Sequence, residues 1–362
     1  MRDLRKEFPV AKHHYYFDTP SSGLMYDSLL EWRNEHDIDF LLGGSKFRYT
    51  HKNFFDEIKK KIARFFDGNQ QTVALIPNTS FGINILLEGL EKSKKILMIK
   101  DDYPSITWAV IYREFDVFYV EANEFLEDNI AKAVNEFKPD VFAFSMVQYI
   151  SGIKIDLDFL KEIKEKNPDL LLIADGTQYL GTERFSFKES NLDVLLTSGY
   201  KWLLGGFGNG FIMVKESVEE RIFPKTMGFN VTNYVDDTTL ETPFIKHFEP
   251  GHQDTLCYGS LGFSLDFFKN IGIENIENHN NALADKAKLA FSDLGFLDIS
   301  AANRKNHSTI FNLKGNEKLH QYLQSNDVVC TPRGNGIRVG FHFYNTEQEV
   351  GNLAVLLKKF KG

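Results

Sequence analysis

Cysteine is scarce in this sequence of 362 residues. The chain contains only two, Cys257 and Cys330, which are too few for a disulfide framework. Chains with so few cysteines are typical of reducing compartments, so we expect a cytoplasmic protein. Residues 1–7 carry charges of both signs and no apolar stretch follows them, which is not the pattern of a signal peptide.

The sequence also lacks an excess of positive charge and a long hydrophobic run. The formal net charge is −8, so a nucleic-acid partner has no bulk electrostatic support. The two longer uncharged stretches, residues 72–87 and 202–214, are interrupted by Pro77 and Asn78 or by several glycines. Neither is suited to span a bilayer, so we expect no membrane segment.

The residues that are abundant predict a large globular fold. Hydrophobic residues make up 43% of the chain, including 33 Phe, and the length corresponds to about two domains. Short apolar runs alternate with helical patterns such as 126–137 and 157–166, which is typical of an α/β fold with a parallel sheet. The predicted strands are 73–76, 95–99, 117–120, 141–145, 170–174, 194–197 and 210–214.

The two ends of the chain follow different patterns. Two long helices are predicted at 258–270 and 273–294, followed by strands at 308–313 and 336–341 and a last helix from Thr346. We therefore predict an N-terminal arm over residues 1–55, a large domain over 56–250 and a small α+β domain over 251–362. The arm contributes to the small domain in this prediction.

Ligands of open parallel sheets bind beyond the carboxyl ends of the strands, and polar residues follow three of the predicted strands. Asn78, Thr79 and Ser80 come after the first strand and begin an apolar helix. Free N–H groups at such a helix start can hold a phosphate, although an ordinary helix cap explains the same residues.

The other two strand ends carry ionisable residues. Asp175 follows the strand at 170–174 and can either cap a turn or hold a buried cation such as a protonated ring nitrogen. Lys201 follows the strand at 194–197 between Tyr200 and Trp202. A lysine in such apolar surroundings has a lowered pKa and becomes a nucleophile for carbonyl groups, although a lysine considered by itself is more often a surface residue.

The order of these groups is that required to bind pyridoxal phosphate. A lysine bonds the aldehyde, a carboxylate keeps the ring nitrogen protonated, and a helix start with hydroxyl side chains holds the phosphate. An aromatic residue such as Tyr103 can cover the ring, and the amide of Gln178 can bond its phenolic oxygen.

At these residues the sequence resembles the class V aminotransferase family of fold type I pyridoxal-phosphate enzymes, from about Phe17 to the end of the chain. The strongest stretches are 147–156, 174–178, 198–206 and 208–211, with 248–251 and 337–347 in agreement. The resemblance implies a three-layer α/β/α large domain with a mainly parallel sheet, a small α+β C-terminal domain and a homodimer. It also implies an amino-acid substrate.

Site roles follow from the same resemblance, position by position. Lys201 matches the Schiff-base lysine and Asp175 the partner of the pyridinium nitrogen. Arg338 matches the arginine that binds the substrate carboxylate. The remaining cofactor contacts implied are Asn78, Thr79, Ser80, Tyr103, Gln148, Tyr149, Gln178, Ser198 and Tyr200.

The sequence departs from the family pattern in places. Many relatives have a histidine where Tyr200 stands. After Gly251 relatives commonly have a threonine that reaches the partner subunit's phosphate, and His252 or Gln253 is the candidate replacement for it here. Arg48 is a candidate for the substrate entrance. Cys330 lies too close to Arg338 to match the sulfur-accepting loop cysteine of desulfurases, and no cluster with metal-ligand spacing is evident.

The shared chemistry of the family runs through a quinonoid intermediate, from which several reactions are open. The lack of an evident acceptor cysteine favours an aminotransferase. A cysteine desulfurase or other lyase, an epimerase and a kynureninase-like hydrolase remain alternatives on the same fold. A cofactor-binding scaffold without turnover is a further alternative.

Overall fold

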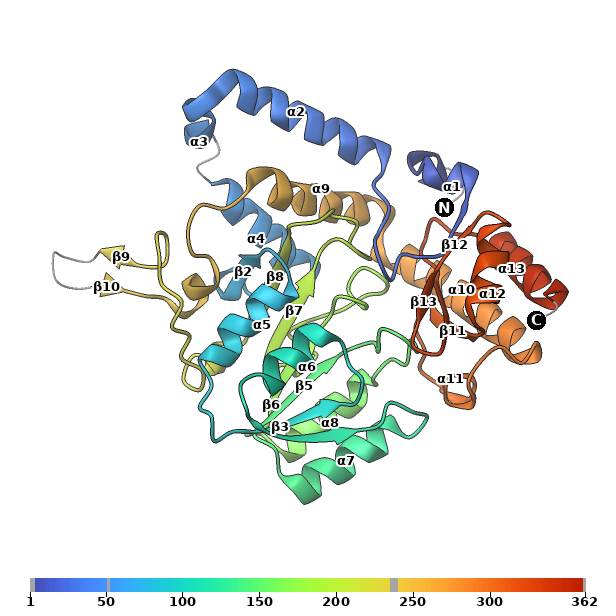
Figure 1. Ribbon diagram of the computed structural model, residues 1–362. Helices are drawn as coiled ribbons and strands as arrows, with labels where there is room; N and C mark the ends of the chain where they lie inside the picture. The colour runs from blue at the N-terminus through green and yellow to red at the C-terminus, as the bar shows by residue number, and fades with distance from the viewer. Residues whose placement is uncertain (1–3, 51–52, 235–239, 361–362) are drawn as a thin grey trace.

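The computed structural model describes residues 4–50, 53–234 and 240–360. At its centre lies a seven-stranded sheet with the strand order β2-β8-β7-β6-β5-β3-β4 (Figure 1). β8 is antiparallel to both of its neighbours, and the other pairs are parallel. The strands are β2 (Val73–Ile76), β3 (Lys95–Ile99), β4 (Asp116–Val120), β5 (Val141–Ser145), β6 (Leu171–Asp175), β7 (Val194–Ser198) and β8 (Gly210–Val214).

The continuous apolar runs of the sequence form strands that are buried on both faces. Five strands of the sheet, β2 and β5 to β8, are buried at every position, whereas the edge strand β4 is partly exposed. All seven predicted strands are confirmed. The prediction places the fifth of them, 170–174, one residue early, since Asp175 is itself buried and paired in β6.

Helices cover both faces of the sheet and give three layers. The helices on one face are α4 (Phe54–Phe65), α7 (Leu126–Phe137), α8 (Leu157–Lys166) and α9 (Thr255–Ile271). The other face is covered by α5 (Thr79–Glu88) and α6 (Pro104–Ile111), together with the short turn at Phe244–Phe248. A small hairpin of β9 (Asn233–Tyr234) and β10 (Leu240–Glu241) extends from this layer. The predicted α/β class is therefore correct.

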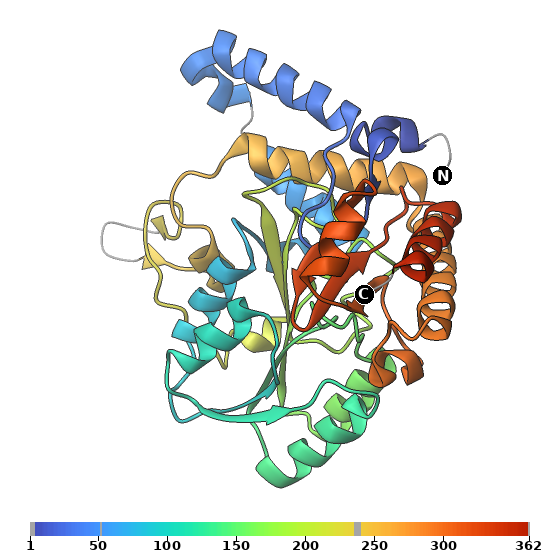
Figure 2. The same ribbon diagram turned by 45° about the vertical axis from the view of Figure 1, so that its right-hand side comes forward.

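A second, smaller sheet lies beside the first in the C-terminal part of the chain (Figure 2). Its antiparallel strands have the order β11-β14-β13, and its apolar face packs against helices in a separate core. The elements are β11 (Ile310–Lys314), β13 (Thr331–Arg333), β14 (Gly336–Gly340), α10 (Ile273–Asp293), α11 (Ile299–Asn303), α12 (Glu317–Gln324) and α13 (Glu347–Lys359). The division at residues 55 and 250 stays a prediction.

The N-terminal residues form an arm that contacts both parts. It contains α1 (Val10–His13), β1 (Tyr15–Tyr16), α2 (Asp27–Gly43) and α3 (Phe47–Thr50). β1 pairs in parallel with β12 (Val328–Val329), and α2 lies along α9 (Figure 1). Within the described ranges, no helix is long and apolar enough to cross a membrane.

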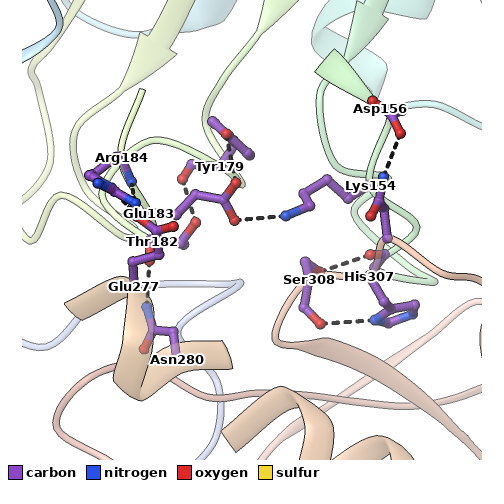
Figure 3. A network of polar contacts seen from close by, with 12 residues as sticks. Lys154, Asp156, Tyr179, Thr182, Glu183, Arg184, Glu277, Asn280, His307 and Ser308 are labelled. Carbon is purple, nitrogen blue, oxygen red and sulfur yellow. Dashed lines mark hydrogen bonds and ion pairs between the residues drawn. The ribbon is translucent and has the colours of Figure 1, made fainter. Parts of the chain in front are cut away.

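Polar contacts join the large sheet's connections to the C-terminal part (Figure 3). Lys154 Nζ and Tyr179 Oη bind the two carboxylate oxygens of Glu183, at 2.8 and 2.7 Å. Arg184 pairs with Glu277 of α10, and Asn280 of the same helix donates to the carbonyl of Thr182. These contacts fix the small sheet beside the carboxyl ends of the large sheet's strands.

Candidate active site

The polar residues singled out in the sequence lie at one edge of the large sheet. β2, β3, β5, β6 and β7 all run in the same direction, so their carboxyl ends meet at this edge. Each strand is followed there by at least one candidate residue. The set comprises Thr79 after β2, Tyr103 after β3, Gln148 after β5, Asp175 and Gln178 at and after β6, and Lys201 after β7.

Lys201 is buried and is only 4% exposed. Its Nζ lies 5.0 Å from the ring centroid of Tyr103 and 5.5 Å from that of Tyr200. Burial, and then the Arg338 guanidinium, lower the pKa of Lys201 to about 7. The amine is thus about half neutral at pH 7, and the neutral form is the one that attacks a carbonyl carbon or accepts a proton.

Asp175 ends β6 in the middle of the sheet and is 4% exposed. Burial raises its pKa, and hydrogen bonds from Thr177 and the charge of Lys201 oppose that rise. The Thr177 N–H donates to Asp175 Oδ1 at 2.8 Å. A buried carboxylate in this position is suited to a cationic partner such as a protonated ring nitrogen. Thr177 is a site residue that sequence reasoning missed.

Hydroxyl groups gather at the start of α5. The Thr79 N–H donates to Ser198 Oγ at 2.9 Å, and Thr79 Oγ1 lies 3.0 Å from Thr177 Oγ1. Ser198 Oγ donates to Thr79 Oγ1 at 3.2 Å. Asn78 caps the helix by accepting from the Phe81 N–H, so the capping interpretation of Asn78 is correct. Helix N–H groups and three hydroxyls at one place form a suitable cradle for a phosphate.

Aromatic side chains line the same edge. Tyr103 and Tyr149 meet edge to face with centroids 5.2 Å apart, and Tyr200 stacks on Phe207 at 4.7 Å. Asp102, which sequence reasoning also missed, accepts hydrogen bonds from the N–H groups of Tyr103 and Ser145, both at 2.7 Å. It thereby ties the start of α6 to the end of β5 and positions the Tyr103 ring.

Arg338 reaches this edge from β14 of the small sheet and is 2% exposed. Its Nη1 donates to the Tyr149 carbonyl at 2.9 Å and its Nη2 to Ser21 Oγ at 2.6 Å. Asp18 Oδ1 lies 3.9 Å from Nη2, and burial lowers the Arg338 pKa to about 10. A guanidinium held in this way presents a planar donor to a carboxylate.

The N-terminal arm forms part of the site through residues 18–23. The Gly23 N–H donates to the Tyr200 carbonyl at 2.8 Å, and a Cβ on Gly23 would lie 2.0 Å from the Lys201 carbonyl oxygen. Only glycine allows this approach of two backbones. Neither Asp18 nor Ser21 is among the predicted site residues, although the turn that contains Ser21 is evident in the sequence.

Three predicted cofactor contacts, Gln148, Gln178 and Ser80, form hydrogen bonds with other residues of the protein. Gln148 binds the Asp101 carbonyl and accepts from the Ile150 and Ser151 N–H groups, and Gln178 joins the Pro20 carbonyl to the Trp202 indole N–H. Ser80 is exposed and bonds Ser105.

The two remaining candidates are His252 and Arg48. The ring of His252 lies against Phe229 at 4.7 Å and faces a cavity lined also by residues of α2. The side chain of Arg48 lies outside the described residues, so its role stays a prediction.

The buried amine, the buried carboxylate and the hydroxyl cradle fit pyridoxal phosphate, and with this fold they define a pyridoxal-phosphate-dependent enzyme of fold type I. The family model of aminotransferase class-V matches residues 43–353, so the chain belongs to this family.

Relatives and solved structures agree over nearly the whole chain. A probable cysteine desulfurase of Methanothermobacter thermautotrophicus is 22% identical, over 99% of this chain and 98% of the relative. An uncharacterized aminotransferase of Bacillus subtilis is 25% identical, over 96% and 94%. The apo structure of the cysteine desulfurase from Thermococcus onnurineus NA1 has a TM-score of 0.86 at 18% identity, covering 99% of this chain and 97% of that one. The cystine C-S lyase C-DES in complex with cysteine persulfide has a TM-score of 0.84 at 18% identity, over 98% and 100%.

The two cysteines lie in surroundings that disfavour a thiolate. Cys330 sits between β12 and β13, is 7% exposed and packs in the small core, where burial raises its pKa to about 12. Burial and the nearby Asp254 carboxylate raise the pKa of Cys257 in α9. A sulfur acceptor has to react as a thiolate, so neither cysteine is suited to that role as the chain is folded.

Proposed function

We propose that this class V enzyme is an aminotransferase that moves the amino group of an amino acid to a 2-oxo acid. The observation that carries the proposal is the Lys201 amine, which is buried, lies over two tyrosine rings and has a pKa of about 7. Such an amine can bond the cofactor aldehyde and afterwards accept and return a proton at neutral pH.

Each neighbouring group has a role in the proposed site. Asp175 faces the ring nitrogen, and Arg338 binds the α-carboxylate of the substrate. The hydroxyl groups of Thr79 and Ser198, with the start of α5 and Tyr200, hold the phosphate. When bound, pyridoxal phosphate supplies an electron sink for the charge left at the α-carbon. The Lys201 amine would be the group that accepts the α-proton of the substrate and holds it for return.

The buried thiols support transamination over desulfuration. A desulfurase passes sulfur to a cysteine on a loop, whereas the Cys330 thiol is packed in a core and has a raised pKa. Transamination needs no thiol, and the groups that it does need are present at the sheet edge.

The experiment is a product analysis of the cofactor-loaded enzyme with a panel of amino acids and 2-oxo acids. We expect a new amino acid in equal amount to the 2-oxo acid formed from the donor. Borohydride treatment should fix the cofactor on Lys201, as located by peptide mass spectrometry, and Lys201→Ala should remove the cofactor's absorbance band. Sulfide and alanine from cysteine, without amino-group transfer, would overturn the proposal.

A carbon–sulfur lyase is the second candidate. It is favoured by the likeness to the cystine C-S lyase and to the probable cysteine desulfurases. A lyase that releases its sulfur product into solution needs no acceptor cysteine, which is compatible with the buried thiols. Pyruvate and ammonia formed from cystine, at a rate that does not depend on added 2-oxo acid, would identify this reaction.

We also propose a homodimer in the cytoplasm. The apolar side chains of Phe40, Leu41 and Leu42 at the end of α2 are 56%, 80% and 81% exposed, which favours a partner surface there. Two free cysteines favour a reducing compartment. Light scattering should give twice the chain mass of 41.6 kDa, and a monomer mass would contradict the dimer.

A further inference from the structure

The face of the small sheet that carries Arg338 also carries a second arginine. The other face, which includes Phe311, Ile337 and Val339, packs into the small core. Side chains alternate along a strand, so Arg338 lies on the opposite face. Thr331 pairs directly with Arg338 across β13 and β14 and shares this face, and so does Arg333, two residues further along β13.

Contacts confirm which way this face is turned. Thr331 Oγ1 donates to Asp18 Oδ2 at 2.6 Å, within the arm segment that lines the site. A Cβ on Gly334, next to Arg333, would lie 3.0 Å from Ile150 Cγ2, and Arg338 donates to the carbonyl of the adjacent Tyr149. Both arginines therefore lie beside the same 149–150 loop. The charge of Arg333 adds to burial in lowering the pKa values of Lys201 and Arg338, and it opposes the rise that burial causes in the pKa of Tyr149.

The charges at this place are unbalanced. Asp18 lies 3.9 Å from Arg338 Nη2, and its Oδ1 has no hydrogen-bond partner. No ion pair to Arg333 is present in the described part of the chain, and the residue is exposed. Asp18 therefore lies beside Arg338, whereas the Arg333 guanidinium is left to bind an anionic group of a ligand.

We infer that Arg333 is a substrate-specificity residue that binds an acidic side chain of the amino-acid substrate, while Arg338 binds its α-carboxylate. This inference rests on the proposed function. The substrate class is then an α-amino acid with a second anionic group, for which L-aspartate and L-glutamate are the probes. Their amides, L-asparagine and L-glutamine, have the same size and lack the charge.

The first test compares amino-group transfer from acid and amide substrates by the cofactor-loaded enzyme. We expect the acids to be preferred in kcat/KM, and Arg333→Gln to reduce the acid-to-amide ratio by about tenfold, mainly through KM. Lys318→Gln is the matched control, because Lys318 is an exposed cation of α12, the helix that packs against the opposite, core face of the same sheet. An equal loss on acids and amides in Arg333→Gln, or a wild-type enzyme without preference, would overturn the inference.

The second test does not depend on turnover. Calorimetric titration of the loaded enzyme with glutarate and with butyrate measures the contribution of the second carboxylate to binding. We expect glutarate to bind about tenfold more tightly, and Arg333→Gln to lose this difference. If glutarate is preferred through Arg333 but no amino group is transferred, the proposed function fails while the inference stands. Equal binding of the two acids by the wild type would refute the inference itself.

Discussion

The lowered pKa of Lys201 gives a direct prediction about how the protein captures its cofactor. Burial and the Arg338 charge bring this pKa from 10.5 to about 7. Only the neutral amine attacks an aldehyde. At about pH 7.5, a lysine with a pKa near 7 is roughly three-quarters neutral, whereas an ordinary lysine is neutral in roughly one molecule in a thousand. We therefore expect the rate of cofactor capture to rise with pH through a midpoint near 7 and then to level off.

Two substitutions should move this midpoint in opposite directions. The Arg338 cation lowers the Lys201 pKa and the Asp18 carboxylate raises it. Arg338→Met should therefore shift the midpoint upward, and Asp18→Asn should shift it downward. Asn keeps the size of Asp18 and an oxygen that can accept the Thr331 hydrogen bond, and circular dichroism checks that both variants fold.

The assay mixes the cofactor-free protein with pyridoxal phosphate in a stopped-flow spectrometer over a series of pH values. The absorbance change gives the bimolecular rate, and a simple alkyl amine under the same conditions corrects for the titration of the cofactor itself. A midpoint close to the ordinary pKa of lysine would refute the reasoning about burial. Shifts of the same sign in both variants would refute the assignment of opposing charges.

Three further predictions concern stability and assembly of the site. Gly23→Ala places a Cβ 2.0 Å from the Lys201 carbonyl, so we expect a lower melting temperature and weaker cofactor binding by fluorescence titration; retention of both would contradict the close approach. Burial lowers the pKa of His307 from 6.5 to about 4, so the unfolded state binds a proton that the folded state does not, and stability falls as pH falls through this window by up to about 1.4 kcal/mol per pH unit. His307→Asn should flatten this slope in urea unfolding measured at several pH values, and an unchanged slope would exclude the histidine as its source. Arg304 is buried and pairs with Glu127, so Arg304→Met should cost about 3 kcal/mol in unfolding free energy, of which the added Glu127→Gln should restore a part.

The large sheet could be predicted from the sequence because most of its strands are buried on both faces. Such strands are largely continuous apolar runs, and four strands, β2, β3, β5 and β8, have the bounds predicted from the sequence. The prediction fails by one residue at Asp175, because a charged residue ends an apolar run even where the backbone pairing continues. The sequence shows where a run of hydrophobic residues ends, whereas the strand ends where its backbone hydrogen bonds to the neighbouring strand end.

The candidate residues at the strand ends could be predicted because they lie next to predicted strands in the sequence. The candidate residues that were missed reach the site only through contacts between distant parts of the chain. Thr79 and Lys201 each come three residues after the end of a strand, so the sequence just before them predicts their place at the sheet edge. Asp18 and Arg333 reach the site only because the arm and the small sheet pack over that edge. Because Thr331 pairs with Arg338, Arg333 lies on the face of the small sheet that is turned toward the site. This register depends on how two strands pair, so it cannot be predicted from either strand alone.

The two glutamines show why residue type alone does not assign a contact. An amide carries a donor and an acceptor, and it satisfies whichever buried backbone groups lie closest. In Gln178 both ends are engaged, by the Trp202 indole and the Pro20 carbonyl, so that it joins the arm to the residue beside Lys201. Gln148 holds the turn that leads to the 149–150 loop. Both amides therefore shape the walls on which the tyrosines and the arginines depend. Each NH2 group has a second N–H besides the one that binds the Asp101 or Pro20 carbonyl, and a hydrogen bond from it to a cofactor would leave these contacts in place.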